Sequence, residues 1–342
     1  MMYTRAKVTG TGSYLPPRIL KNDDLKPYMD VTDEWIYQVS GIRQRHYADT
    51  GTYTSDLACE ASKIALEDAG LEPADIDCII FATLSPDIHM PGTGVFLQDK
   101  LGIADLGCAC YDIRQQCSGF VYAVEMAKAF IESGQYKTIL VVGAEIQSSG
   151  IEYSNRGRDV TILFGDGASA VVFQPFETER ADDGLFFAEM HADGRGAFDG
   201  VYQRVFDVSK KPAIFYDTLD YSVNHETAVK MSNPRKLFSN AVIRMADETK
   251  KSLEKNGLSL DDVDWVLPHQ ANLHIIRDMG QRLKIDKEKV LMNIHKYANT
   301  SAATIPLLLD EYIRNGSIQP GHLIVFTAFG AGFTWGTALM RY

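Results

Sequence analysis

The sequence lacks several features that would assign it to other classes of protein. No apolar run is long enough to span a membrane, and the residues after Met1 do not form the apolar region of a signal peptide. No Pro-, Gly- or Ser-rich linker divides the chain, and the formal net charge of −11 argues against a general role in binding nucleic acid. A cytoplasmic globular protein of 342 residues is therefore expected.

Cysteine is scarce and unevenly placed. The five cysteines all lie within the first 117 residues, at positions 59, 78, 108, 110 and 117. The number is odd, and Cys108 and Cys110 have no second pair with which to complete a zinc site. Reduced thiols are expected, with no metal site and no bound cofactor.

A strand followed by a helix is predicted around Cys117. Residues Ala109 to Ile113 form a short apolar run typical of a buried strand, and from Cys117 to Gly134 apolar residues recur every three or four positions. Cys117 would then lie in the first turn of a helix, where free N–H groups and the helix dipole favour a nucleophilic thiolate. A buried structural cysteine is the alternative interpretation.

The second half of the chain repeats the first. Leu66-Glu67, Gly70-Leu71 and Asp75-Ile76-Asp77 recur as Leu253-Glu254, Gly257-Leu258 and Asp262-Val263-Asp264, at a constant offset of 187 residues. A helix, a turn and a buried strand in the same order predict two homologous α/β halves. Each half would hold a mostly parallel sheet covered by helices.

Histidine and asparagine follow predicted strands and turns of the second half. His269 comes directly after the strand that repeats residues 76–83, and ligands of open α/β sheets collect at the carboxyl ends of strands. Asn299 precedes a helix and is either a helix cap or a site residue. The glycine-rich stretch 328–336 offers backbone N–H groups to an oxyanion. His191, like His46, His225 and His322, lies among loop signals and is expected to be solvated.

Taken together, these motifs resemble the thiolase superfamily and, within it, the β-ketoacyl-acyl carrier protein synthase III family. The resemblance rests on four segments in family order, residues 116–120, 268–273, 299–303 and 329–336. Residues 33–36 and 164–168 add to the match. It implies a five-layered αβαβα thiolase fold built from two pseudo-repeated halves, 1–175 with Cys117 and 176–342 with His269 and Asn299. It also implies a homodimer.

The resemblance further implies a decarboxylative Claisen condensation that initiates fatty-acid synthesis. Cys117 would take an acyl group from an acyl-CoA primer, while His269 and Asn299 would hold the carbonyl of malonyl-acyl carrier protein as carbon dioxide leaves. The enolate then attacks acyl-Cys117 to give a 3-oxoacyl thioester, and the backbone at Cys117 and Ala331 forms the oxyanion hole. Two fixed donors suit an enolate oxygen, since an imidazole N–H and an amide can both supply one.

Other members of the superfamily and other classes fit less well. No cysteine follows Cys117, unlike in degradative thiolases, and Asn299 stands where synthases I and II have a second histidine. Plant-type polyketide synthases share Cys-His-Asn but are usually longer. A papain-like hydrolase would leave the internal repeat unexplained. A catalytically silent partner subunit is the third alternative, and the intact Cys117, His269 and Asn299 argue against it.

Residues outside the three catalytic positions bear on the substrate. By resemblance, Trp35, which could otherwise be a core residue, and Arg158 bind the adenine of CoA. Met90 takes the place of a bulky aromatic in the acyl tunnel, which favours a primer longer than acetyl. By resemblance, His274 replaces an arginine that helps dock acyl carrier protein. The basic residues Arg277, Arg282, Lys284 and Lys287 that follow are expected to give an acidic carrier a positive docking surface, with an ordinary solvated helix face as the alternative. A specialised homologue with a longer primer, acting in secondary-metabolite synthesis, is the alternative function.

Overall fold

The computed structural model describes residues 1–202 and 228–342. The segment 191–230 is longer than is usual in the family that the sequence resembles, and most of it lies outside the described residues. The strands are β1 Tyr3–Tyr14, β2 Arg18–Lys21, β3 Gln44–Tyr47, β4 Cys78–Ala82, β5 Ala109–Ile113, β6 Ile139–Glu145, β7 Gly167–Thr178, β8 Gly184–Ala192, β9 Val201–Tyr202, β10 Lys230–Met231, β11 Trp265–Pro268, β12 Leu323–Gly330 and β13 Thr334–Arg341.

The helices of the described residues differ greatly in length. They are α1 Asp33–Ser40, α2 Thr54–Ala69, α3 Thr93–Lys100, α4 Gly119–Glu132, α5 Arg158–Thr161, α6 Pro234–Lys255, α7 Leu273–Leu283, α8 Ile294–Tyr297 and α9 Thr304–Arg314. None of these helices combines the length and the hydropathy that crossing a membrane requires.

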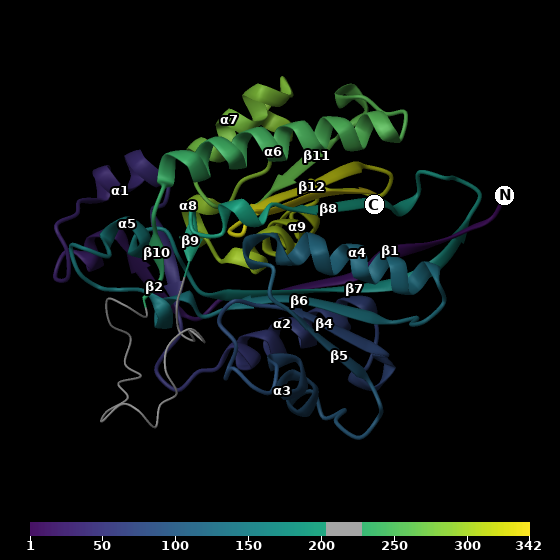
Figure 1. Cartoon of the computed structure of the whole chain (residues 1–342). Helices are drawn as coiled ribbons and strands as arrows, with labels where there is room; N and C mark the ends of the chain where they lie inside the picture. The colour runs from purple at the N-terminus through teal and green to yellow at the C-terminus, as the bar shows by residue number, and fades with distance from the viewer. Residues whose placement is uncertain (203–227) are drawn as a thin grey trace.

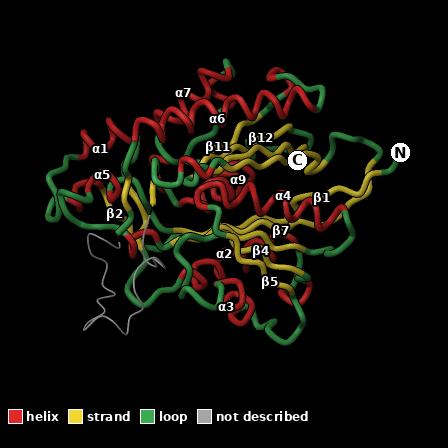
Figure 2. The backbone as a smooth tube through the Cα atoms, viewed as in Figure 1, coloured by secondary structure: helices red, strands yellow, loops and turns green. Residues whose placement is uncertain are grey.

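Helices and strands alternate in five layers (Figures 1 and 2). Helices α2 and α3 cover the outer side of the N-terminal strands, α4 and α9 lie in the middle, and α6 packs on β12 and β13 with α7 beside it. A middle helix must be apolar on most of its surface. In α9 this is visible as the buried run from Ile305 to Leu309. The five-layered thiolase fold expected from the sequence is confirmed.

Nine of the strands form one sheet in the order β11-β12-β13-β8-β1-β7-β6-β4-β5, while β2 pairs with β3 and β9 pairs with β10 in two small sheets. β1 and β8 meet only at Ala6 and Leu185, so this bridge joins the strands of the two halves. The structure contains the repeat that the sequence predicted. The equivalent strands β4 and β11 begin at residues 78 and 265, which are 265 − 78 = 187 positions apart. The expected boundary between residues 175 and 176 falls inside β7, which continues to Thr178.

Individual predictions had different outcomes. The helix that carries Leu66-Glu67 of the repeat is α2, which Gly70 ends at φ 67°. The strand Ala109–Ile113 has the expected bounds, but the expectation that it is buried was wrong, because β5 is the last strand of the sheet and is partly exposed. His191 lies on β8 rather than in a loop, and its side chain is 31% exposed.

Candidate active site

Cys117 lies where the predicted strand gives way to the predicted helix. It belongs to the short 3-10 helix Gln116–Ser118, which leads directly into α4. Gln116 takes a positive φ of 48°, which turns the chain sharply ahead of the nucleophile. Cys117 therefore sits in the turn just before α4 rather than within its first turn.

His269 follows β11, and one hydroxyl fixes its protonation. Its Nδ1 is 2.7 Å from Thr304 Oγ1, which in turn donates to Ser301 O at 2.8 Å. Because a hydroxyl has a single hydrogen, Nδ1 carries the proton and Nε2 holds the lone pair in the neutral ring. Burial lowers the pKa of His269 to about 3. In the resting enzyme Nε2 of the imidazole is therefore a proton acceptor. It is not the N–H donor that the resemblance to the family implied.

Asn299 is held in one orientation by the backbone. Its Oδ1 accepts a hydrogen bond from Ser301 N–H at 2.8 Å, and its own N–H donates to Leu163 O at 2.9 Å. The side-chain amide is nearly buried, at 5% exposure of the residue. With the oxygen engaged, the Nδ2 group is the end of the amide that is turned outward as a donor.

Ser301 connects the three predicted catalytic residues. Its hydroxyl donates to Cys117 Sγ at 3.7 Å, its N–H bonds the Asn299 side chain, and its carbonyl accepts from the Thr304 hydroxyl that fixes His269. Ser301 has a positive φ of 50°, and in this conformation its hydroxyl, N–H and carbonyl each bond a different neighbour. The structure thus brings Cys117, His269 and Asn299 to one place. Sequence reasoning assigned no role to Ser301 or Thr304, although both lie beside Asn299.

A buried carboxyl lies behind Ser301. Glu145, at the end of β6, accepts hydrogen bonds from the backbone of Leu84 and Ser85 and from the Ser85 hydroxyl at 2.6 Å. Burial raises the pKa of Glu145 to about 7, and these bonds oppose the rise. It is a site residue that the sequence did not predict, since only the fold places β6 against the turn at Ser301.

Burial decides the protonation of Cys117. The residue is partly exposed, but protein surrounds its thiol, and this burial raises the pKa of Cys117 to about 12. A helix N-terminus contributes at most about 2 kcal/mol, roughly a thirtyfold gain in acid dissociation. Moving the pKa to about 12 costs about a thousandfold in the same constant. The thiolate expected from the sequence is therefore not the resting form; the thiol is.

This protonation state predicts the pH dependence of alkylation. The thiolate is the reactive form, so alkylation of free Cys117 by iodoacetamide should rise about tenfold per pH unit from about pH 7 to pH 10, without a plateau. Mass spectrometry of the Cys117 peptide measures this rate, and a Cys117→Ala variant identifies labelling elsewhere. A plateau reached near neutral pH would mean that a thiolate exists at rest.

The glycine-rich turn lies directly against the nucleophile. A Cβ atom on Gly330 would stand 3.1 Å from the backbone nitrogens of both Cys117 and Ser118, so only glycine lets the turn approach this closely. Thr334 fastens the turn by a 2.7 Å bond to the Ser118 hydroxyl and a 3.2 Å bond to Ala331 O. The predicted oxyanion hole at Cys117 and Ala331 remains a prediction that this close packing favours.

Trp35 and Arg158 meet at the surface. The Arg158 guanidinium lies 5.3 Å from the centre of the Trp35 ring, and both residues line a pocket of about 410 Å³ with residues 30–32. The two side chains stack on each other, so a flat ring could enter between them only if they separate. Their predicted role in binding CoA fits this placement and stays a prediction.

The structure does not gather the remaining predicted residues at the site. Met90 is 85% exposed, so in one chain it forms no wall of an enclosed tunnel, and its role in the acyl tunnel stays a prediction. His274 bonds Gln38 O at 2.8 Å, and Arg282 forms two bonds to Asp247. Arg277 is exposed on α7 about 140° around the helix from Arg282. The predicted docking arginines therefore do not share a face.

A cysteine, a histidine and an asparagine linked through Ser301 in a duplicated five-layered fold define a condensing enzyme of the thiolase type. Residues 111–194 match the family model 3-oxoacyl-acyl-carrier-protein synthase III, and residues 253–342 match its C-terminal counterpart. The beta-ketoacyl-acyl-carrier-protein synthase III of Xylella fastidiosa is 41% identical over 341 residues, 98% of each chain. The chain belongs to the β-ketoacyl-acyl carrier protein synthase III family.

Other relatives agree with this assignment. The synthase III of Thioalkalivibrio sulfidiphilus is also 41% identical, over 99% of this chain and all of its own. The solved structure of 3-oxoacyl-acyl-carrier-protein synthase III from Aquifex aeolicus has a TM-score of 0.87 at 38% identity, covering 98% of this chain and 100% of that one. A priming β-ketosynthase of the R1128 polyketide pathway has the same TM-score at 30% identity, covering 99% and 97%. The higher identity to the synthases III supports the condensation that initiates fatty-acid synthesis over the specialised alternative.

Proposed function

We propose that Cys117 and His269 carry the acyl-transfer half of the reaction. His269 Nε2 takes the proton of the Cys117 thiol as the sulfur attacks the carbonyl of an acyl-CoA. The thioester bond to CoA breaks, and the departing sulfur receives that proton from Nε2. A neutral imidazole with a free Nε2 lone pair is the form that this step needs.

The second half consumes one proton. When malonyl-acyl carrier protein loses carbon dioxide, its enolate attacks acyl-Cys117, and the sulfur leaves as a thiolate that must be protonated. In this proposal His269 is protonated once the anionic malonyl group is bound, because a nearby negative charge raises the pKa of a histidine. The new Nε2–H and Asn299 Nδ2 then donate to the enolate oxygen, and the proton passes to Cys117.

The observation that carries the proposal is the connection of all three residues through Ser301. Intact-mass measurement after incubation with acetyl-, butyryl-, hexanoyl- and octanoyl-CoA tests it. One acyl adduct per chain on the wild type, none on Cys117→Ala, is expected, and the series also gives the primer length. An adduct of unchanged yield on the Cys117→Ala chain would contradict the proposal.

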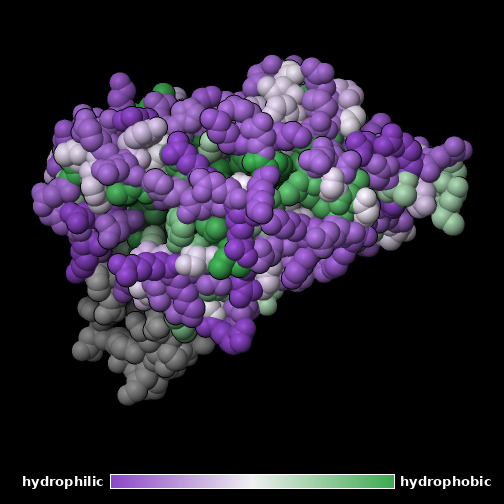
Figure 3. Space-filling model, turned by 90° about the horizontal axis from the view of Figure 1, so that it is seen from above, coloured by the Kyte–Doolittle hydropathy of each residue, from purple (hydrophilic) through white to green (hydrophobic). Residues whose placement is uncertain are grey.

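Carrier-protein docking is proposed for Arg277 alone. The face that carries α6 and α7 is mostly hydrophilic (Figure 3), so an acidic carrier would be recognised there by charge. Arg277 is exposed and has no ion pair within the described residues, whereas Arg282 is neutralised by Asp247. His274 is occupied by its bond to Gln38.

Charge reversal separates the two arginines. Arg277→Glu should raise the KM for malonyl-acyl carrier protein about fivefold or more, and the effect should shrink as salt screens it. Arg282→Glu should do less. Malonyl-CoA as the extender and Lys251→Glu on α6 are the controls. Equal effects of the two arginine variants would remove Arg277 as the docking residue.

A homodimer and a cytoplasmic location complete the proposal. β5 ends the nine-stranded sheet with one open edge, and such an edge can pair with a second copy. Met90 could line a tunnel only if another chain covered it. All five cysteines are unpaired, which suits a reducing compartment.

A further inference from the structure

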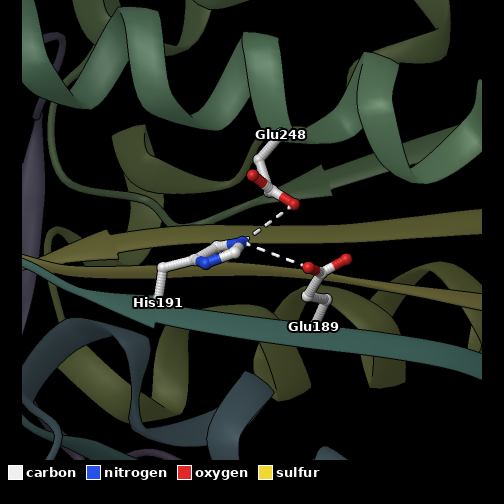
Figure 4. Close-up of side chains that lie close together, drawn as sticks. All are labelled: Glu189, His191 and Glu248. Atoms are coloured by element: carbon white, nitrogen blue, oxygen red, sulfur yellow. Dashed lines mark ion pairs between the residues drawn. The ribbon is translucent and has the colours of Figure 1, made fainter.

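Two carboxylates converge on one histidine away from the residues proposed for catalysis. Glu189 and His191 are two positions apart on β8 and so lie on the same face, and Glu248 reaches them from α6 (Figure 4). His191 Nε2 is 3.0 Å from Glu248 Oε1 and 3.9 Å from Glu189 Oε1. One ligand atom from each residue lies within 4.8 Å of the other two.

The short contact in this cluster is not an ordinary hydrogen bond. His191 Nε2 is buried and has no hydrogen-bond partner within the described residues, although Glu248 Oε1 is only 3.0 Å away. A separation of 3.0 Å between a ring nitrogen and a carboxylate oxygen is reached when a cation lies between them, either a proton on Nε2, as in an ion pair, or a metal ion bonded to both atoms. Ligand atoms on a tetrahedral zinc ion with bonds of about 2.1 Å are about 3.4 Å apart. The two separations at His191 Nε2, 3.0 and 3.9 Å, lie on either side of this value.

The charges around the cluster favour a divalent ion. The Glu248 side chain is 6% exposed, and its one ion pair in the described part of the chain is the contact with His191. Lys255 pairs with the other oxygen of Glu189, Oε2, so Oε1 remains turned toward His191.

The ring of His191 is held ready for a ligand bond. It stacks on Trp335 with ring centres 5.3 Å apart and an interplanar angle of 27°. The His191 carbonyl accepts a 2.8 Å hydrogen bond from the hydroxyl of Tyr122, in the first turns of α4. These contacts limit the rotation of the imidazole, which lowers the entropy lost when a metal binds.

We infer that Glu189, His191 and Glu248 form a structural site for a divalent cation of the zinc class. One imidazole and two carboxylates are ligands that Zn²⁺ accepts, with water completing the tetrahedron. The ion would tie α6 to β8 next to α4, and it takes no part in the condensation. Residue spacing did not predict this site, because two ligands come from β8 and the third comes from a helix 57 positions further along the chain (248 − 191 = 57).

Zinc titration of the chelator-treated full-length protein tests this inference. Isothermal titration calorimetry should show one Zn²⁺ per chain, and Glu248→Gln and Glu189→Gln should each weaken binding about tenfold or more. Glu254→Gln, on the exposed side of the same helix, should bind as the wild type does. Zinc should raise the Tm of the wild type and of Glu254→Gln but not that of Glu248→Gln.

X-ray absorption of the bound zinc separates this site from the cysteines. Nitrogen and oxygen ligands without sulfur are expected. Sulfur in the coordination sphere would assign the ion to a cysteine and overturn the inference. Equal affinity of the wild type and both carboxylate variants, or no binding at all, would also overturn it and leave an ordinary histidine–glutamate ion pair. Because Glu189 is partly exposed, its variant keeps the test valid if Glu248→Gln does not fold.

Discussion

Replacing Cys117 with alanine should lower the rate of condensation about a thousandfold or more, because no other group in the site can form the acyl thioester. Slow decarboxylation of malonyl-acyl carrier protein should persist, since His269 and Asn299 remain in place through Thr304 and Ser301. Product formation and release of labelled carbon dioxide, measured on the same samples, give the two rates.

Cys59→Ala is the matched control for this substitution. Cys59 is a buried cysteine of α2 whose sulfur contacts the carbonyl of Lys100, so its loss should leave both rates nearly unchanged. If Cys117→Ala condensed at the wild-type rate, the assignment of the nucleophile would be wrong. If it also lost all decarboxylation, the separation of the site into a nucleophile and an enolate pocket would be wrong.

Replacing Asn299 with aspartate should lower decarboxylation and condensation about 10²- to 10³-fold, the usual loss when one oxyanion donor is removed. An aspartate oxygen can still accept the hydrogen bond from Ser301 N–H, so the turn keeps its shape while the Nδ2 donor disappears. Acylation of Cys117 by acyl-CoA should be affected much less. Intact-mass kinetics and carbon dioxide release measure the two halves separately.

The chain supplies a close control for this variant. Asn315 accepts the same kind of bond, at its Oδ1 from the N–H two residues later, but at the exposed end of α9. Asn315→Asp should therefore change neither half-reaction. A wild-type rate of decarboxylation in Asn299→Asp would mean that the enolate is stabilised elsewhere.

The internal repeat predicted two homologous α/β halves, and the resemblance to the thiolase superfamily implied their five-layered arrangement. The 187-residue offset between Leu66 and Leu253 predicted that α6 is the second-half equivalent of α2 and that β11 is the equivalent of β4, because repeated helix–turn–strand units bury the same faces. The order of the strands was not accessible in this way. β5 has the apolar composition of an interior strand, and only its place at the end of the sheet leaves it partly exposed.

The site was predicted less completely, since its connections cross the whole chain. Ser301 and Cys117 are 184 positions apart in sequence, and no local signal shows that the hydroxyl, N–H and carbonyl of one serine connect the three site residues. The protonation of Cys117 was mispredicted for a related reason. A helix start is visible in the sequence, whereas the burial that raises the pKa of the thiol comes from segments far along the chain.

The most direct measurement of the central claim is a chase of acetyl-labelled enzyme. Wild-type protein carrying a labelled acetyl group on Cys117 is mixed with malonyl-acyl carrier protein, and the label on the Cys117 peptide, the carbon dioxide and the 3-oxoacyl product are followed together. The mechanism predicts that label leaves Cys117 at the rate at which product appears, with one carbon dioxide released per product. Product formed while the label stays on Cys117 would contradict it.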